Sequence, residues 1–328
     1  MAASDERPPV SRREFLAASL VAASASSLPG CTPRPRVVRG ACHHDCPDTC
    51  AWLVTVADGK VVRFEGDPHH PLTRAELCPL MSGYPDDVTF NPDRILHPLR
   101  RTGKKGEGRF ERVSWDEALG EVAGRLKKIV AEHGPTAVLP YSYAGTEGLV
   151  QMDALSSRFF ARLGASRLER NVCGSAGYEG VAATIGTGLG MLPQDAAWSR
   201  LVVVWGANPA VTNAHGWPFV LEAKTKGARV VVIDPLRSRT AEQADWHVRP
   251  RPGTDAALAL GMMHVIVRDS LHDADYVERY TLGFDRLKPR LAEYPPERVA
   301  RITGLPAAEV EELGRAYATT RPAAIRTL

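Results

Sequence analysis

Four cysteines have the residue type and the spacing of a metal–thiolate site. Cys42, Cys46 and Cys50 lie within one short segment, and Cys78 follows after a longer interval. Thiolates are the ligands that iron–sulfur clusters and zinc prefer. Structural zinc sites more often use two Cys-x-x-Cys pairs, so three close cysteines with a distant fourth, and with Pro47 among them, favour a [4Fe-4S] cluster. Zinc and a pair of disulfides are the alternatives, although the three close cysteines leave little room for two well-built bridges.

A second group of residues has the layout of a nucleotide site. Gly206 and Asn208 follow an apolar run over residues 201–205, and Asp234 follows a second run over residues 229–233. In doubly wound sheets, ligands bind outside the carboxyl ends of the strands, where a helix N-terminus takes a phosphate and an acid binds ribose or base donors. The full G-x-G-x-x-G fingerprint is absent, and Gly and Asp also serve turns and caps, so a purely structural role stays open.

A further candidate anion site lies at the start of a predicted helix over residues 256–267. Gly253, Thr254 and Asp255 precede it, and Thr254 is the natural N-cap. Plain capping is the alternative interpretation.

The segment after Cys50 is predicted to be a hairpin. Residues 51–65 alternate in polarity and are rich in Val, and Asp58-Gly59 divides them. Asp-Gly between two such runs is a strong hairpin signal. The hairpin would turn the chain back and bring Cys78 to the other three cysteines.

The remainder of the chain predicts an α/β body. Ser114 and Glu117 form a capping box, and apolar residues then recur at helical spacing up to Gly134. The other predicted elements, in chain order, are an exposed linker over 100–108, a strand over 137–141, a helix over 150–163, a loop over 170–177, strands over 201–205 and 229–233 with a helix to 226 between them, helical segments over 256–267, 273–280, 284–293, 296–303 and 306–319, and the start of a strand at the C-terminal residues. The predicted fold class is α/β: a small, β-rich N-terminal iron–sulfur lobe, then a doubly wound, Rossmann-like parallel sheet.

Net charge and the lengths of the apolar runs argue against a nucleic-acid-binding protein and against a transmembrane helix after the N-terminus. The apolar fraction of 44% is enough for a core, and the net charge of +3 is too small to indicate nucleic-acid binding. After the N-terminus, no apolar run is long enough for a transmembrane helix.

The N-terminus predicts export. Arg12-Arg13, followed by Phe-Leu and a short apolar run, resembles the twin-arginine signal, which moves proteins already folded around a cofactor. We therefore expect residues 1–31 to be a signal segment and the protein to be periplasmic or in the cell envelope. Residues 23–25 offer a cleavage site, and Cys31 ends a lipoprotein-like box and is a candidate for a lipid anchor. A cytosolic tail with an accidental Arg pair is the alternative.

In their order along the chain, these motifs resemble one family, the molybdopterin-guanine-dinucleotide oxidoreductases (the dimethyl sulfoxide reductase family). The resemblance runs from the twin-arginine segment to the last residue. It rests on Pro47-Asp48-Thr49 within the cysteine segment and on residues 91–99, 114–118, 206–209, 233–235 and 252–255. It implies a 4Fe-4S domain over residues 38–100 and a molybdopterin oxidoreductase α/β domain over residues 110–328, truncated at the C-terminus.

The resemblance also implies two cofactors. The [4Fe-4S] cluster would bind Cys42, Cys46, Cys50 and Cys78. A molybdenum or tungsten ion would be held by two molybdopterin guanine dinucleotides, one of which would lie with its nucleotide part along Gly206, Asn208, Asp234, Gly253 and Asp255.

The family usually adds one protein ligand to this metal, and Cys173 stands in the corresponding loop. Ser175 is the second choice, and an ordinary buried thiol is the alternative interpretation of Cys173. Two features depart from the family. Leu80 stands two residues after Cys78, where the family has Lys between cluster and pterin, and family members are much longer than this chain.

The leading hypothesis is an exported molybdopterin-dependent oxidoreductase that acts on a small-molecule substrate. Its cluster would pass electrons between the molybdenum or tungsten site and a partner subunit. The second hypothesis is a catalytically incomplete remnant that binds a cluster and a nucleotide without turnover. A third, a NAD-type dehydrogenase, conflicts with the absent glycine fingerprint.

Overall fold

The computed structural model describes residues 34–44, 46–142, 154–169, 174–186 and 190–327. The predicted signal segment, Cys31 and Cys173 lie outside these residues. Within the described ranges, no helix combines the length and apolar character that a membrane crossing requires.

An antiparallel sheet dominates the N-terminal lobe (residues 34–90), with the strand order β1 (Arg36–Ala41), β2 (Ala51–Ala57) and β3 (Lys60–Gly66). β2 and β3 form the predicted hairpin. Their turn uses two left-handed residues, Asp58 with φ 50° and Gly59 with φ 74°, which is the turn that fits the twist of paired strands. β1, which the alternation does not predict, pairs with β2 from Arg36 opposite Val56 to Ala41 opposite Ala51.

A second, smaller hairpin follows helix α2 (Pro79–Ser82) and a π-helical turn, Pro85–Thr89. β4 (Leu99–Arg101) pairs with β5 (Phe110–Arg112), so the predicted linker over 100–108 is wrong at its start. Arg100 is held in the strand because its guanidinium binds Glu121 at 3.0 Å and Glu111 at 3.4 Å.

Helix α3 (Trp115–His133) begins at the predicted capping box. The Glu117 amide donates to Ser114 Oγ (3.2 Å), and the Ser114 amide donates to the Glu117 carboxylate (2.8 Å). These bonds to Ser114 stabilise the ionised carboxylate and lower the pKa of Glu117. The helix ends at Gly134, whose φ of 78° is left-handed, as predicted.

The predicted strand over residues 137–141 is wrong. Pro135–Ala137 form a 3-10 turn, and residues 138–142 form no strand. A strand needs a neighbour for its backbone groups. Here the Val138 carbonyl instead accepts the amide of Ser166 at 3.0 Å.

Two helices lie between α3 and the parallel sheet. α4 (Leu155–Leu163) matches the second half of the predicted helix, while residues 143–153 lie outside the described ranges. α5 (Ser175–Ile185) begins inside the predicted loop over 170–177, so that prediction is wrong for its last residues.

Four parallel strands form the central sheet of the body, in the order β8 (Trp246–Val248), β7 (Arg229–Ile233), β6 (Leu201–Trp205) and β9 (Ala323–Thr327). β6 and β7 are the two predicted apolar strands, and β9 is the predicted C-terminal strand; β8 is too short for its pattern to predict it. Because β7 and β9 lie on opposite sides of β6, the strand order reverses at β6, which makes this a topological switch point.

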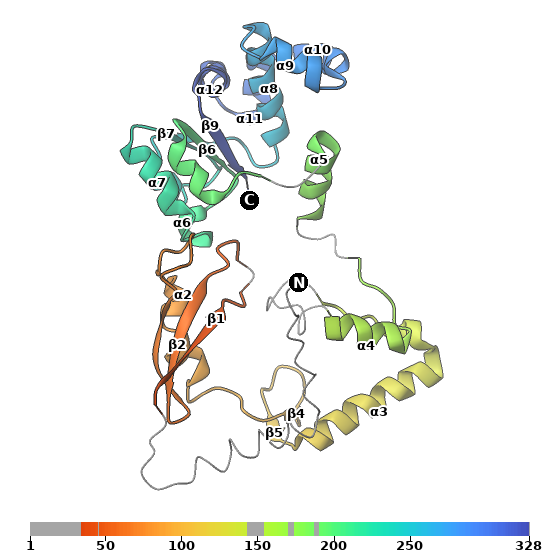
Figure 1. The fold of residues 1–328 in the computed structure, drawn as a ribbon. Coiled ribbons are helices and arrows are strands. Elements are labelled where there is room, and N and C mark those ends of the chain that lie inside the picture. Colours follow the sequence, from red (N-terminus) through yellow and green to blue (C-terminus); the bar gives the residue numbers. More distant parts are fainter. Residues whose placement is uncertain (1–33, 45, 143–153, 170–173, 187–189, 328) are drawn as a thin grey trace, which may run out of the picture.

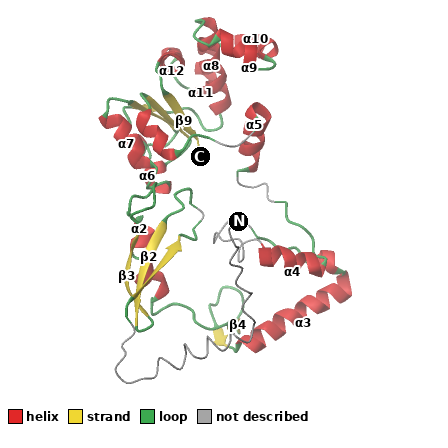
Figure 2. Cartoon of the chain, in the orientation of Figure 1, coloured by secondary structure: helices red, strands yellow, loops and turns green. Residues whose placement is uncertain are grey.

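Helices cover both faces of this sheet (Figures 1 and 2), which confirms the predicted doubly wound α/β class. One face packs against α7 (Trp217–Thr225) and a 3-10 turn, Pro193–Trp198. The other face packs against α8 (Asp255–Arg268), α11 (Pro296–Thr303) and α12 (Ala307–Thr319). The remaining elements of the body are α6 (Pro209–Thr212), a 3-10 turn Ala241–Gln243, α9 (Ala274–Tyr280) and α10 (Phe284–Ala292).

The N-terminal lobe contacts α7 of the body. The Arg74 guanidinium lies 4.3 Å from the centre of the Phe219 ring and 3.6 Å from the Glu222 carboxylate. Leu72 packs against the core on the α7 face of the sheet. Figure 1 shows α6 at the end of the sheet that faces the lobe. The loop after β6 is therefore next to the cysteine segment.

Candidate functional site

The four cysteines lie where elements of the N-terminal lobe begin or end. Cys42 follows β1 and Cys50 precedes β2, and the Cys42 amide donates to the Cys50 carbonyl at 2.7 Å. Cys78 is the residue before α2. With Cys46, all four carry free thiols; Cys50 is buried and the others are half-buried.

The thiols are close enough to affect one another's ionisation. Burial raises the pKa of Cys50 to about 12, and the Asp48 carboxylate and the other three thiols add to the rise. Burial also raises the pKa of Cys46, although a hydrogen bond from the backbone of Asp48 acts in the opposite direction and lowers it. Four thiolates in this place need a positive counter-charge, which the irons of a cluster supply. The four side chains thus fit the cluster that the resemblance implies.

The described residues contain no group of three His, Cys, Asp or Glu side chains placed to hold one metal ion. In a [4Fe-4S] cluster each thiolate binds a different iron, so its ligands stand farther apart than those of a single zinc ion. The preference for a cluster over zinc rests on the spacing of the four cysteines along the chain.

A buried polar network joins the cysteine segment to the loop after β6, and sequence reasoning missed it. The Asp48 carboxylate accepts hydrogen bonds from the Asn213 side-chain amide, from the His215 backbone amide (3.1 Å) and from His215 Nδ1 (2.8 Å). The same Nδ1 lies 3.6 Å from Cys50 Sγ. All four side chains are buried. No local pattern pairs residues so far apart in sequence; the only signal was that Asn213 and His215 follow the Gly206–Pro209 turn.

The predicted nucleotide residues gather at the carboxyl edge of the parallel sheet. Gly206 follows β6, and its amide donates to the Ile233 carbonyl at the end of β7 (2.9 Å). Its φ of 63° is left-handed, which favours Gly. Asp234 follows β7 and accepts the amide of Leu236 (2.7 Å), so one of its oxygens closes a turn. The carboxyl ends of β6 and β7 thus present Gly206 and Asp234 side by side.

Asp255 and Asn208 tie neighbouring loops to this edge. Asp255, at the start of α8, accepts a hydrogen bond from the Trp205 indole at the end of β6 (2.7 Å). Asn208 Oδ1 accepts from the hydroxyl (2.7 Å) and the amide (3.3 Å) of Thr240, which is fully buried. Both side chains therefore have structural roles here, which leaves their predicted contacts with a nucleotide as a proposal.

The start of α8 differs from its prediction. Thr254 is the N-cap residue, but its hydroxyl donates to the Arg251 carbonyl (2.6 Å) and does not cap the helix. Gly253 has a left-handed φ of 76°, and a Cβ there would meet no atom within 4 Å. The helix N-terminus is therefore free of a side-chain cap and open beside Gly253, which suits an anion.

Arg326 supplies the observation that points to an anion at the switch point. It lies on β9, opposite Val204 of β6, near the carboxyl end of the sheet. Its Nε is buried and has no hydrogen-bond partner within the described part of the chain. A buried N–H group without a partner is costly, and a phosphate oxygen would satisfy it. The phosphates of the dinucleotide that the resemblance implies would supply such an oxygen.

Three other predicted residues have different outcomes. Cys173 lies outside the described residues, so its place relative to the cluster stays a prediction. Ser175 is the first residue of α5. The Leu80 side chain is 73% exposed and cannot donate a hydrogen bond.

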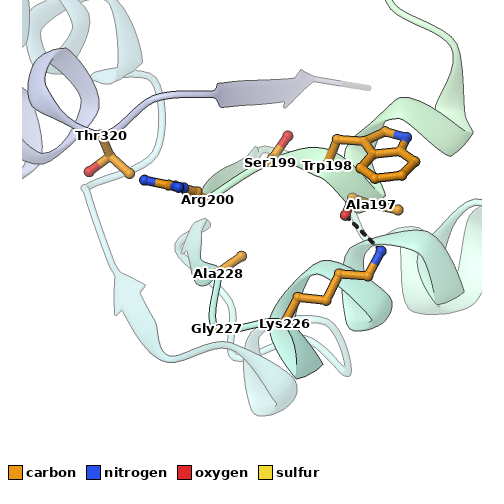
Figure 3. Close-up of a pocket in the computed structure, with 8 residues that line it drawn as sticks. All are labelled: Ala197, Trp198, Ser199, Arg200, Lys226, Gly227, Ala228 and Thr320. Atoms are coloured by element: carbon orange, nitrogen blue, oxygen red, sulfur yellow. Dashed lines mark hydrogen bonds between the residues drawn. The ribbon is translucent and has the colours of Figure 1, made fainter.

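A hollow of about 560 Å³ in the described part of the chain is not this site. It lies at the amino ends of β6 and β7, at the opposite edge of the sheet. In Figure 3 the Lys226 side chain reaches toward Ala197, whose carbonyl it contacts at 3.4 Å, and lies over the Trp198 ring. Lys226 also pairs with Glu222, so its charge is already compensated.

Comparison with known protein families decides the class. Residues 35–80 match the molybdopterin oxidoreductase Fe4S4 domain, and residues 94–324 match the molybdopterin oxidoreductase family. The chain belongs to the molybdopterin oxidoreductase family.

Three relatives show what share of the length of a family member this chain covers. It is 38% identical to "Probable oxidoreductase YoaE" of Bacillus subtilis over 90% of this chain and 43% of that protein. It is 31% identical to the "Thiosulfate reductase molybdopterin-containing subunit PhsA" of Salmonella typhimurium, over 96% of this chain and 42% of that protein. The solved acetylene hydratase from Pelobacter acetylenicus superposes with a TM-score of 0.63 at 31% identity, covering 87% of this chain and 39% of that one. The chain thus spans about two fifths of the length of these relatives.

Proposed function

We propose that this molybdopterin oxidoreductase chain holds a [4Fe-4S] cluster on Cys42, Cys46, Cys50 and Cys78 and binds one molybdopterin guanine dinucleotide at the carboxyl edge of its parallel sheet. When bound, the molybdenum or tungsten pterin supplies the oxidation or reduction of a small substrate, and the cluster supplies electron transfer. The observation that carries the proposal is the position of the four thiols, which lie where the N-terminal lobe meets the loop after β6.

The residues of this chain have distinct parts in that proposal. The backbone at Gly206 and Gly253 is open, so a phosphate can approach it closely, and the uncapped start of α8 offers amide donors. Arg326 gives its unpaired Nε to the same anion. Asn208 and Asp255 fix the loops that line the edge. Asp234 uses one carboxylate oxygen in its turn, and we assign the other to donors of the nucleotide. Cys173 is proposed as the protein ligand of the metal, with Ser175 as the second choice.

We also propose export and an electron-transfer partner. The twin-arginine segment around Arg12 and Arg13 supports export to the periplasm or cell envelope, because this route carries proteins folded around cofactors. The relative from Salmonella typhimurium is named as a subunit, which supports a partner chain that exchanges electrons with the cluster.

Elemental analysis of the anaerobically purified chain tests the proposal. Four irons with one molybdenum or tungsten per chain is the expected result for the oxidoreductase. Zinc in place of iron would overturn the assignment of the cysteines.

A second function, binding of the cluster and one nucleotide without turnover, is favoured by Leu80, which stands where the family has Lys between cluster and pterin. A chain with this function would contain four irons and no heavier metal. The same analysis therefore separates the two.

A further inference from the structure

We propose that His215 is a positioning residue for the iron–sulfur cluster: from the α/β body, it shares its Nδ1 hydrogen between Asp48 and the sulfur of Cys50 and thereby raises the reduction potential of the cluster. The inference rests on the proposed function, because it requires a cluster on Cys50.

The hydrogen bonds around Asp48 are the basis for assigning the ring hydrogen of His215 to Nδ1. Asp48 accepts hydrogen bonds from the Asn213 side chain and from the backbone amide of His215. Both of these groups are donors to the Asp48 carboxyl, and we assign the same role to Nδ1, which lies 2.8 Å from Asp48 Oδ2. His215 therefore presents an Nδ1–H group to Asp48.

Cys50 Sγ shares this hydrogen. It lies 3.6 Å from the same Nδ1, within the range of an N–H···S contact. A thiol would compete poorly for Nδ1, because the nitrogen has no free lone pair when it donates to Asp48. A cluster-bound thiolate is an acceptor and fits the contact. The arrangement is thus the one in which a metal ligand receives a hydrogen bond from a residue that a carboxylate orients.

The contact joins two parts of the chain that both belong to the proposed cofactor site. Asp48 and Cys50 lie in the cysteine segment, and Asn213 and His215 lie in the loop that begins at Gly206. Asp48 is 1% exposed and His215 is 5% exposed, so water does not replace these bonds. Leu80, which stands where the family has Lys, makes no polar contact with the body. Among the described residues, His215 is the body residue that hydrogen-bonds a cluster ligand.

The expected effect on the cluster has a definite sign. Reduction adds negative charge to the cluster and its sulfurs, and a hydrogen bond to a ligand sulfur stabilises that charge. Loss of the His215 donor leaves Cys50 beside the buried Asp48 carboxylate without that bond. The reduced state then becomes less favourable, and the reduction potential falls.

The test is a redox titration of the anaerobic chain, followed by the electron paramagnetic resonance signal of the reduced cluster. His215→Leu is expected to lower the midpoint potential and alter the signal. His215→Asn, whose amide nitrogen stands near the position of Nδ1, is expected to restore both. His264→Leu is the matched control, because His264 also bonds through Nδ1, to the Leu291 carbonyl in the body (2.9 Å).

A potential for His215→Leu equal to that of the wild type or of the control would overturn the inference. If the Leu variant loses iron, His215→Gln replaces it, since its amide lies beyond the position of Nδ1. A lower potential for Gln than for Asn supports the inference, and equal potentials for Gln, Asn and wild type overturn it. Failure of the proposed function is distinguishable, because the wild-type chain would then hold no four-iron cluster to titrate.

Discussion

Cys50 combines burial, a nearby carboxylate and three neighbouring thiols, and all three keep its sulfur protonated when no metal is bound. The same sulfur is the one that His215 contacts. At the scale of single residues, the chemistry of this protein therefore depends on how the charge on Cys50 is compensated, by irons in the loaded chain and by a proton in the metal-free chain.

Substitution of one cluster ligand tests the assignment of the four cysteines. Cys50→Ala is expected to reduce the iron content below four per chain, because each thiolate binds one iron of the cluster. Cys173→Ala is the control, since Cys173 is proposed to bind the other metal, and its iron content should stay at four. Iron analysis with the visible absorption spectrum measures both. Full iron in Cys50→Ala would remove Cys50 from the ligand set.

The raised pKa of Cys50 predicts an alkaline loss of stability in the metal-free, reduced chain. Below about pH 9, the usual pKa, the thiol is protonated in both the folded and the unfolded state, so its contribution to stability is fully present. Between about pH 9 and pH 12 the unfolded thiol ionises first, which favours unfolding. Urea unfolding across this range should show a smaller decline for Cys50→Ser than for the wild type. Parallel declines would contradict the prediction.

At the scale of elements, the packing of α8 against α11 and α12 depends on one glycine. A Cβ at Gly261 of α8 would lie 2.8 Å from Val299 Cγ2 of α11 and 3.1 Å from Val310 Cγ1 of α12. Both valines are fully buried, so neither can move into solvent. The glycine thus allows three helices to meet on one face of the sheet.

Gly261→Ala is therefore expected to lower the free energy of unfolding by about 1–3 kcal/mol, the usual cost of overpacking a core. Gly120→Ala in α3 is the matched control. No atom lies within 4 Å of a Cβ at Gly120, and Ala favours helix over Gly by about 1 kcal/mol. Denaturant unfolding followed by circular dichroism measures both. Equal midpoints for the two variants would show that the helices can separate without cost.

At the scale of the whole molecule, α3 carries apolar side chains that nothing in the described structure covers. Trp115, Leu119 and Val122 follow one another at helical spacing and are 65%, 60% and 56% exposed. Figure 1 shows α3 and α4 lying away from the parallel sheet. Exposed apolar side chains on one face of a helix favour association.

We expect the 328-residue chain to self-associate through this face of α3. The double variant Leu119→Glu, Val122→Glu removes apolar surface and should shift the chain toward monomer in sedimentation velocity and reduce binding of a hydrophobic dye. Lys127→Glu on the same helix changes charge without removing apolar surface and should leave association unchanged. Association that persists in the double variant would place the contact elsewhere.

Features that depend on a few neighbouring residues followed from the sequence. The capping box at Ser114, the Asp58-Gly59 turn and the buried strand over residues 201–205 were predicted because the residues that form each of them are adjacent in the chain. The strand predicted over residues 137–141 failed for the complementary reason. Its apolar residues are adjacent in the chain, but a strand also needs a partner strand from a distant part of the chain, and residues 135–137 form a 3-10 turn instead.

Contacts between distant segments were decided only by the tertiary structure. The sequence offered the four cysteines and the residues after β6 and β7 as separate candidates. The fold joined them through Asp48 and His215, and it placed Arg326 of β9 beside β6 at the switch point. Such pairings depend on strand order and on how two lobes pack, because burial and hydrogen bonding act between side chains that are close in space, whatever their separation along the chain.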